Sequence, residues 1–206
     1  DKVEKLGMKM LSGDPALFTM HSDGKLIGMI CIHVDDVLIL GNKTFKETFS
    51  RKLFNTFKIS KVETDRFKYL GCEIEKVGNG DIILNQDEYI QNIEEVRVPE
   101  KKNSCKVSEP ERKEIRRVVG ALLWVSLMTR PDLSFEVNRL STNISSASIR
   151  ELKDAKLLVE KAKAEPIPLR FTKIGCMKDL RIQLYTDASF NNQDAKIRST
   201  EGRVIL

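Results

Sequence analysis

The spacing of apolar residues divides the start of the chain into strands and one helix. Apolar runs at 16–20 and 26–40 flank the sequence HSDGK, which predicts two antiparallel strands joined by a turn at Asp23–Gly24. Between 43 and 57 apolar side chains then recur at every fourth position among Lys and Glu. This is the period of an amphipathic helix.

Two further strands are predicted around the sequence GNG at 78–80. Apolar segments at 66–77 and 81–86 flank it, and Asn and Gly readily adopt the positive φ that a tight hairpin turn requires. The chain then becomes helical, with apolar residues at intervals of three and four. The four predicted helices cover 87–96, 111–128, 132–141 and 148–164.

From Pro166 onward the pattern of strands returns. Short apolar segments at 167–174, 180–190 and 202–206 predict strands that follow the helices. Strands with one helix, a helical middle and a final set of strands together predict the α+β class. The changes of pattern divide the chain into 1–85, 86–165 and 166–206.

The amino-acid composition and net charge limit which kinds of protein this chain can be. With 206 residues and 41% hydrophobic content, the chain is large enough to bury a core. A net charge of +5, from 35 basic and 30 acidic residues, is compatible with a polyanionic partner and equally with an ordinary mixed surface. Four widely separated cysteines and two histidines lack the spacing of a zinc site and suit an intracellular compartment.

The sequence predicts neither a membrane span nor a secretory leader. The longest apolar stretch, 26–40, is interrupted by His33, Asp35 and Asp36, so it is too short and too charged to cross a bilayer. The first ten residues have neither an initiator Met nor the apolar core of a signal peptide. We interpret this start as the interior of a longer polypeptide.

Asp35 and Asp36 are adjacent acids inside an otherwise apolar run. Apolar residues at 29–34 and 37–40 predict a hairpin with the two aspartates as its two-residue tip. Backbone strain and charge repulsion at such a tip each cost about 1 kcal/mol, and a bound divalent cation would remove the repulsion. The alternative is an acidic turn that is simply exposed to water.

Receiver domains of two-component signalling also place paired acids after an apolar strand. In those domains a helix follows the pair, and the phosphorylated Asp ends a later strand. Here the apolar run continues at 37–40, and Asp81 begins a strand instead of ending one. The context therefore argues against a receiver domain.

Six motifs span nearly the whole chain: HVDDVLILG, FKYLGCEIE, ILNQDEYIQNI, VVGALLWVSLMTRPDLSFEVNRLS, YTDASF and RSTEGRVIL. Taken in this order, they resemble one family, the reverse transcriptase and ribonuclease H region of copia-type LTR retrotransposon polyproteins. The resemblance implies the C-terminal half of a polymerase palm with its catalytic β-hairpin at 1–85 and a helical thumb and connection at 86–165. It further implies the first strands of a ribonuclease H-like α/β domain at 166–206.

The resemblance also implies a metal site. Asp35 would be the main metal-binding carboxylate of the palm and Asp36 its neighbour, holding Mg²⁺ or Mn²⁺ for two-metal nucleotidyl transfer. Two carboxylates on a stiff hairpin suit magnesium, which prefers oxygen ligands at about 2.1 Å. The third carboxylate of the family lies on an earlier strand, which would precede Asp1. The chain alone is therefore expected not to extend a primer.

Residues beside the primer-template follow from the same resemblance. His33 stands where the family usually has Tyr, and Leu70 and Gly71 resemble the primer grip, where a backbone without side-chain bulk lets the primer approach. Independently of the resemblance, the basic residues of the helical middle, among them Lys113 and Arg116 on the predicted helix 111–128, are candidates for contact with phosphates. The ordinary alternatives are a half-buried strand His, a hairpin Gly and a solvated charged helix face.

Two further parts of the sequence also lead to predictions. Trp124, with its neighbours Leu122 and Leu123, is expected in the helix core instead of on a base-stacking surface. Asp187, in the strand motif YTDASF, resembles the first active-site acid of ribonuclease H. The remaining acids of that site would lie beyond Leu206.

The function implied by the resemblance is that of a fragment of an RNA-directed DNA polymerase. In the parent polyprotein its partners would be an RNA or DNA primer-template, deoxynucleoside triphosphates and the rest of the polyprotein. No membrane would be involved, and the expected locations are cytoplasmic virus-like particles and the nucleus. The alternative is a decayed or co-opted retroelement product that binds nucleic acid or has no activity. An in-frame palm-strand Asp encoded upstream of Asp1 would distinguish the two.

Overall fold

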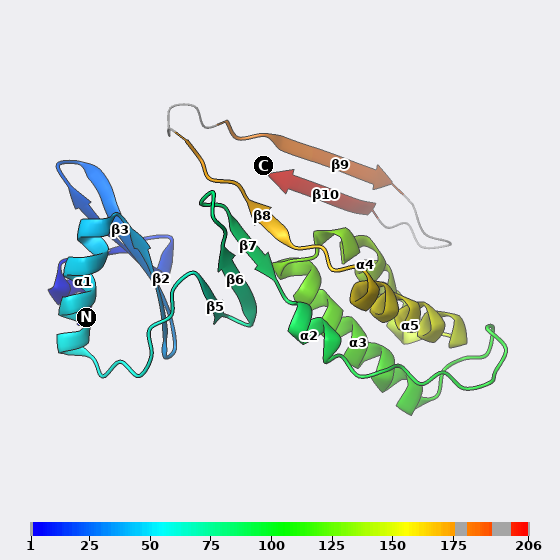
Figure 1. Ribbon diagram of the computed structural model, residues 1–206. Coiled ribbons are helices and arrows are strands. Elements are labelled where there is room, and N and C mark those ends of the chain that lie inside the picture. Colours follow the sequence, from blue (N-terminus) through cyan, green and yellow to red (C-terminus); the bar gives the residue numbers. More distant parts are fainter. Residues whose placement is uncertain (1, 176–180, 191–198, 206) are drawn as a thin grey trace. The chain divides into compact units, whose positions relative to one another are not determined.

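The computed structural model describes residues 2–175, 181–190 and 199–205. They form two compact units that divide after Phe171. The first unit contains two four-stranded antiparallel sheets and a helical segment, and the second contains a two-stranded sheet (Figure 1). The predicted α+β class is confirmed.

The first sheet has the strand order β1-β2-β3-β4. A 3₁₀ helix at Glu4–Leu6 precedes it. As predicted, Asp23 and Gly24 form the turn between β2 and β3, and both have positive φ, at 50° and 72°. The strands cover Lys9–Leu11, Asp14–Ser22, Lys25–His33 and Asp36–Gly41.

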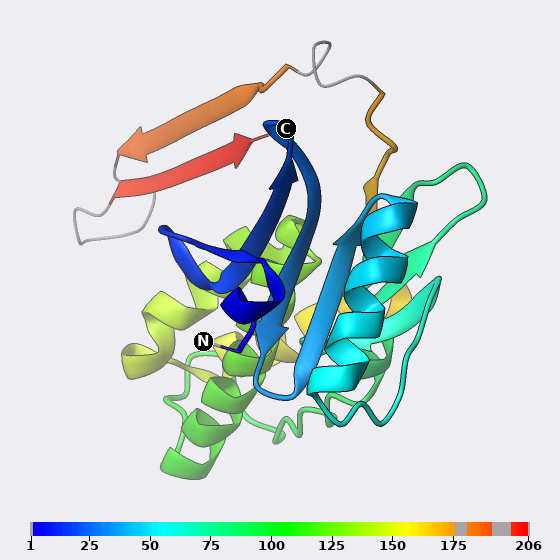
Figure 2. The same cartoon turned by 90° about the vertical axis from the view of Figure 1, so that its left-hand side faces the viewer.

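Helix α1, Lys43–Thr56, lies along one face of this sheet (Figure 2). It begins where the Asn42 side chain accepts a hydrogen bond from the Phe45 N–H (2.7 Å), and it ends where Phe57 becomes extended. The predicted fourfold apolar spacing is confirmed as the buried face of the helix. The core between sheet and helix comprises Val3, Met8, Phe18, Ile30, Phe45, Phe49 and Leu53.

Two glycines let α1 approach the sheet closely. Gly28 in β3 and Gly41 in β4 are directly opposite each other, and the Phe45 ring lies over both. A Cβ added at Gly28 would be 2.2 Å from the Phe45 ring, and one at Gly41 would be 2.4 Å from it. Since neither distance is sterically allowed, glycine at these positions allows Phe45 to lie against the strands.

The second sheet has the order β5-β6-β7-β8. The predicted hairpin at GNG is confirmed, because β6 and β7 are antiparallel and Gly80 has φ 90° in the connection between them. The sheet is completed by a strand from much later in the chain, which pairs with β7. The four strands cover Arg66–Tyr69, Cys72–Lys76, Ile82–Asn85 and Leu169–Phe171.

An ion pair helps to hold β8 on the sheet edge. Arg170 in β8 donates from Nε and Nη2 to one carboxylate oxygen of Asp81, at 2.9 and 2.8 Å. Asp81 is buried, whereas the Arg170 side chain is 56% exposed, so this charge-assisted contact lies at the edge of the protein interior. Strand β8 lies inside the segment 166–206 that the sequence groups with the third domain, yet its hydrogen bonds are with β7.

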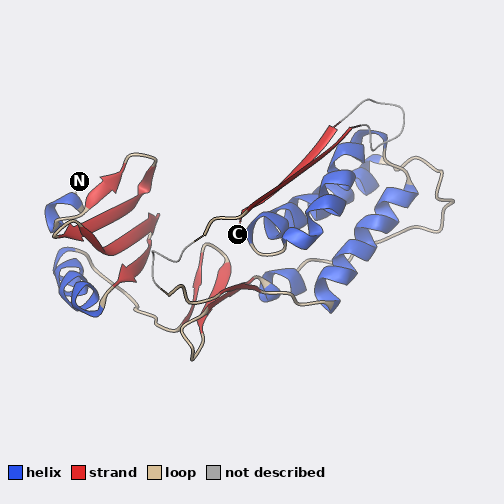
Figure 3. Ribbon diagram, turned by 90° about the horizontal axis from the view of Figure 1, so that it is seen from above, coloured by secondary structure: helices blue, strands red, loops and turns tan. Residues whose placement is uncertain are grey.

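The helical segment follows β7 directly, and Figure 3 shows strands leading into helices there. Two long helices begin with capping boxes, in which Ser108 pairs with Glu111 and Ser148 with Glu151. The Lys101 ammonium and the Ser108 cap lower the pKa of Glu111 from 4.5 to about 2. The helices cover Asp87–Gln91 (α2), Glu109–Met128 (α3), Ser134–Asn143 (α4) and Ile149–Ala164 (α5), with 3₁₀ turns at Pro131–Leu133 and Ile144–Ser146.

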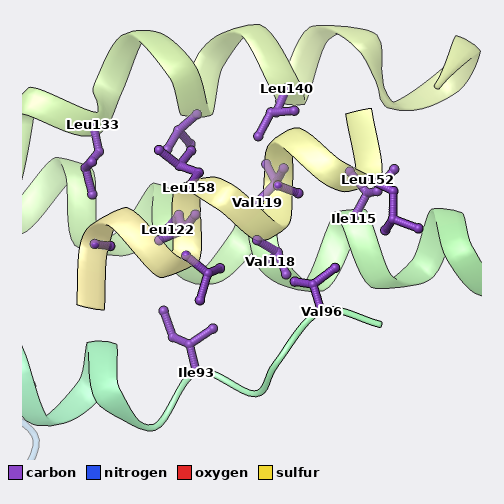
Figure 4. Close-up of a cluster of buried hydrophobic side chains, with 14 of the residues drawn as sticks. Ile93, Val96, Ile115, Val118, Val119, Leu122, Leu133, Leu140, Leu152 and Leu158 are labelled. Carbon is purple, nitrogen blue, oxygen red and sulfur yellow. The ribbon is translucent and has the colours of Figure 1, made fainter. Parts of the chain in front are cut away.

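A second hydrophobic core lies among these helices (Figure 4). Leu122 of α3 is fully buried in it, as predicted. The same prediction is wrong for Leu123 and Trp124, which are 43% and 40% exposed. They lie on the outer face of α3 because α4 and α5 pack against its other side. Helix α2 also ends five residues earlier than predicted, at Gln91.

The C-terminal unit contains two antiparallel strands, β9 (Leu184–Phe190) and β10 (Ser199–Ile205). Strands were predicted at both places. Cys176 lies outside the described residues. No helix within the described ranges has the length and apolar character that a membrane span requires.

We predict that Gly28→Ala lowers the free energy of unfolding by about 1–3 kcal/mol, because the new methyl group would overpack the contact with Phe45. Urea unfolding followed by circular dichroism measures the change. Gly13→Ala is the matched control, since a Cβ at Gly13 meets no atom within 4 Å. Equal stabilities of the two variants would contradict the close packing.

Candidate functional site

Strands β3 and β4 form the predicted hairpin around the paired aspartates, but its tip lies one residue earlier than predicted. His33 pairs with Asp36, so Val34 and Asp35 form the two-residue loop and Asp36 is the first residue of β4. The reason is the register: Ile30 pairs with Ile39 on the face that packs on α1. A slip of one residue would turn these side chains out of the core.

Val34 carries the backbone strain of this loop. Its φ is 53°, a left-handed conformation that is unfavourable for a β-branched residue, and its side chain is 83% exposed. The Val34 side chain is not buried, so packing does not offset this strain. Residues held in such conformations cluster at functional sites, which makes this turn a candidate site on structural grounds as well.

Asp36 and His33 point to the face of the sheet opposite α1. They are directly paired, so their side chains share a face, and Ile32 and Val37 beside them face the α1 core. Asp35, Asp36 and His33 are all exposed. His33 is therefore not the half-buried strand residue of the ordinary alternative.

The turn between β5 and β6 approaches this same face. Leu70 and Gly71 both have positive φ, at 51° and 72°, which forms a tight two-residue turn between Tyr69 and Cys72. The Tyr69 hydroxyl is buried and has no hydrogen-bond partner among the described residues. It lies near the thiol of Cys31, on the β3 face opposite α1, and that thiol helps to raise its pKa. The structure thus brings the predicted Leu70–Gly71 element close to the aspartate hairpin.

Tyr69 is a residue of this site that the sequence did not indicate. Burial raises the pKa of its hydroxyl, and the Cys31 thiol and the negative charges of Asp36 and Asp14 raise it further. Tyr69 is therefore a neutral phenol at physiological pH. The available signal was an aromatic residue directly before Leu-Gly in a strand, which marks a turn but not what the ring contacts.

The two aspartates alone would be an incomplete ligand set for a metal ion. Within residues 2–175, 181–190 and 199–205, no three His, Cys, Asp or Glu side chains are grouped closely enough to hold a metal. Asp35 and Asp36 are oxygen donors on a rigid hairpin, as a hard divalent cation requires. They would supply part of its coordination shell.

One face of α3 combines basic and aromatic residues. Lys113, Arg116, Gly120, Trp124 and Leu127 are all exposed and recur at intervals of three and four, so they share one side of the helix. The cations lie in the first half of the helix, and the apolar side chains lie in the second half. We call this set the α3 face.

The charges beside the α3 face are partly paired. Arg116 donates to Glu109 at 3.1 Å, and both side chains are largely exposed, so the pair is weak. Arg117, on the flank of the helix, donates to Glu114 at 2.7 Å and thereby lowers the pKa of that carboxyl.

The α3 face also meets the β5–β6 turn. A Cβ added at Gly71 would lie 3.9 Å from Trp124 Nε1. The Leu70–Gly71 turn therefore lies between two neighbours. Tyr69, just before the turn, is near Cys31 of β3, and Gly71 itself is near Trp124 of α3. Asp187 belongs to the other unit, in β9 opposite Gly202, and its side chain is outside the described part.

Comparison with curated proteins finds relatives of low identity. The Pol polyprotein from transposon RE1 of Arabidopsis thaliana is 28% identical over 93% of this chain, and that from transposon RE2 is 29% identical over 93%. A putative transposon Ty5-1 protein of Saccharomyces cerevisiae is 26% identical over 99%. The chain is distantly similar to copia-type retrotransposon Pol polyproteins.

The extent of these matches differs between the retrotransposon relatives. The chain spans only 14% of the length of each Arabidopsis polyprotein and 70% of the yeast protein. No family model matches the chain, and no solved structure matches it.

We predict that Val34→Asn raises the free energy of unfolding by about 1 kcal/mol, because Asn tolerates the left-handed conformation better than Val. Chemical unfolding measures this change. Val62→Asn is the control, since Val62 is also exposed (64%) but does not have positive φ. A loss of stability in the Val34 variant alone would show that the loop is not strained.

Proposed function

We propose that this chain is the part of an RNA-directed DNA polymerase that carries the catalytic hairpin of the palm and a helical surface for the primer-template duplex. The observation that carries the proposal is the strained hairpin with Asp35 and Asp36 at its end, beside the Leu70–Gly71 turn. Similarity to retrotransposon Pol polyproteins supports it.

Asp35 and Asp36 would hold Mg²⁺ or Mn²⁺ through their carboxylate oxygens. When bound, the metal lowers the pKa of a primer 3′-hydroxyl and stabilises the departing pyrophosphate. The hairpin contributes geometry, because β3 and β4 anchor the loop in the core against α1. The remaining acid ligand would come from another segment of the parent polyprotein, so nucleotidyl transfer is a property of the parent.

The α3 face would lie along the sugar-phosphate backbone of the duplex. Lys113 and Arg116 supply positive charge for phosphates, and the exposed Trp124 supplies a flat apolar surface. Gly120 lies between them, and a Cβ there would meet no atom of the protein within 4 Å. The backbone of α3 is therefore open to close approach at the middle of this face.

His33, Leu70 and Gly71 would lie beside the primer. His33 shares a face with Asp36, and the turn at Leu70–Gly71 is fixed next to that face by Tyr69. For the C-terminal unit, we propose that β9 and β10 are the first strands of a ribonuclease H-like domain, with Asp187 as one of its acids. Other acids of that site would again come from outside this chain.

A second candidate is a retroelement product that binds nucleic acid without catalysis. The incomplete set of metal ligands within the described ranges favours it. It shares the α3 face with the first candidate and differs in having no need for Asp35. Metal binding at the hairpin therefore discriminates between the two.

We predict that Mn²⁺ or Mg²⁺ binds this chain with a dissociation constant on the order of millimolar, since two carboxylates leave most of the coordination shell to water. Isothermal titration calorimetry with Asp35→Asn should show loss of the binding heat. Asp23→Asn, at the exposed β2–β3 turn, is the matched control. Equal heats for wild type and Asp35→Asn would remove Asp35 as a ligand.

We predict that a primed duplex binds with an affinity that decreases with salt, and that Lys113→Ala makes the slope of log K against log salt shallower by about 0.9. Fluorescence anisotropy across a salt series measures both quantities. Lys156→Ala, on the exposed side of α5, should leave the slope unchanged. Identical slopes for wild type and the Lys113 variant would show that the α3 face does not contact phosphates.

A further inference from the structure

Two polar motifs that the proposed function does not use meet inside the helical segment. Gln86 follows β7 in the motif LNQ, and Thr129 and Arg130 follow α3 in the motif TRPD. All three residues are 1% exposed. Burying polar side chains to this extent is unfavourable unless their hydrogen bonds are satisfied. The hydrogen bonds of this cluster must therefore account for its burial.

Hydrogen bonds connect these residues across three elements. The Thr129 hydroxyl donates to Gln86 Oε1 at 2.9 Å, which ties the end of α3 to the start of α2. Arg130 donates from Nη1 to the carbonyl of Ala162 at 3.3 Å, which ties the same point to the last turn of α5. Asp132 accepts from Arg130 Nε and Nη2, both at 2.9 Å, and so holds the guanidinium in place.

The path of the chain connects the same elements a second time. Strand β7 runs into Gln86, and α5 leads through 165–168 into β8, which pairs with β7. The ends of α3 and α5 and the neighbouring ends of β7 and β8 are thus joined through one buried cluster. We call Gln86, Thr129, Arg130 and Asp132 the polar joint.

The Leu70–Gly71 turn lies at the end of the sheet nearest the polar joint. Glu73, two residues after the turn, pairs with Asn85, and Asn85 directly precedes Gln86. Glu73 also accepts a hydrogen bond from the Glu88 N–H of α2 at 3.3 Å, and Lys68 forms an ion pair with Glu88. The position of the turn over α3 therefore depends on how β7 enters α2.

The polar joint is not the arrangement that would maximise stability. Gln86 Nε2 is buried and has no hydrogen-bond partner among the described residues. An apolar side chain of similar size would avoid this cost. Buried polar contacts are directional, whereas apolar side chains of similar volume can repack in several ways, and in some proteins buried polar groups are retained for such specificity.

We propose that Gln86, Thr129, Arg130 and Asp132 are positioning residues, which fix the Leu70–Gly71 turn against Trp124 and so set the spacing between the aspartate hairpin and the α3 face. The importance of that spacing for a duplex rests on the proposed function. The positioning itself does not, and it is measured without nucleic acid.

Trp124 is the one tryptophan of the chain and reports on the turn directly. Thr129→Val removes the hydroxyl with little change of shape. We expect lower stability, Trp124 emission at longer wavelength and stronger quenching by acrylamide, because the turn no longer shields the indole. Val137→Ala is the control, since Val137 is buried in α4 as part of the hydrophobic core and is not a member of the polar joint, so its truncation should lower stability alone.

The decisive variant replaces both partners, as Gln86→Leu with Thr129→Val. Apolar residues at both positions leave no unpaired group, so we expect stability to return to that of the wild type. Trp124 emission and quenching should nevertheless remain altered. Recovery of wild-type fluorescence together with stability would overturn the proposal, because the joint would then act through packing alone. The same conclusion follows if Val137→Ala shifts the fluorescence equally.

Duplex binding by the doubly substituted protein separates the two proposals. Altered fluorescence with weakened binding supports both of them. Altered fluorescence with unchanged binding supports the polar joint and argues against a duplex that spans the turn and the α3 face.

Discussion

The register between β3 and β4 is the constraint on which the candidate site depends. Ile30 and Ile39 are paired across the two strands on the face that packs against α1, where Ile30 is fully buried and Ile39 partly buried. The ring centroids of Phe45 and Phe49 in α1 are stacked 5.1 Å apart. A slip of one residue would turn this apolar surface toward water. The core therefore assigns Val34 and Asp35 to the loop and Asp36 to the strand, and the backbone accepts strain at Val34 as a result.

Local sequence patterns were sufficient for most elements. The fourfold spacing of Phe45, Phe49 and Leu53 reports the buried face of α1 because every such residue meets the same sheet. The GNG hairpin was predictable because its turn chemistry is contained in three residues. The existence of the aspartate hairpin was predictable for similar reasons, whereas its exact loop depended on a core that the pattern alone does not describe.

Features that depend on distant partners could not be predicted. Nothing in the sequence around Leu169 indicates that it pairs with Leu84. Trp124 and Leu122 are two residues apart in an apolar run, and only the packing of α4 and α5 decides which of them is buried. Tyr69 joins the site through Cys31, a contact between segments that carry no shared motif. The roles of Asp35, Asp36 and Asp187 stay predictions.

The late strand of the second sheet has a consequence for how the protein folds. Strands β5, β6 and β7 are close in sequence and can associate early, but β8 reaches them only after the ribosome has synthesised the whole helical segment. The entropic cost of closing such a long loop is modest, since each doubling of loop length adds only about 0.6 kcal/mol to that cost. Non-local pairing is nevertheless slow. During synthesis the outer edge of β7 would remain open until α3, α4 and α5 have assembled, and an open strand edge is a site for wrong pairing with other chains.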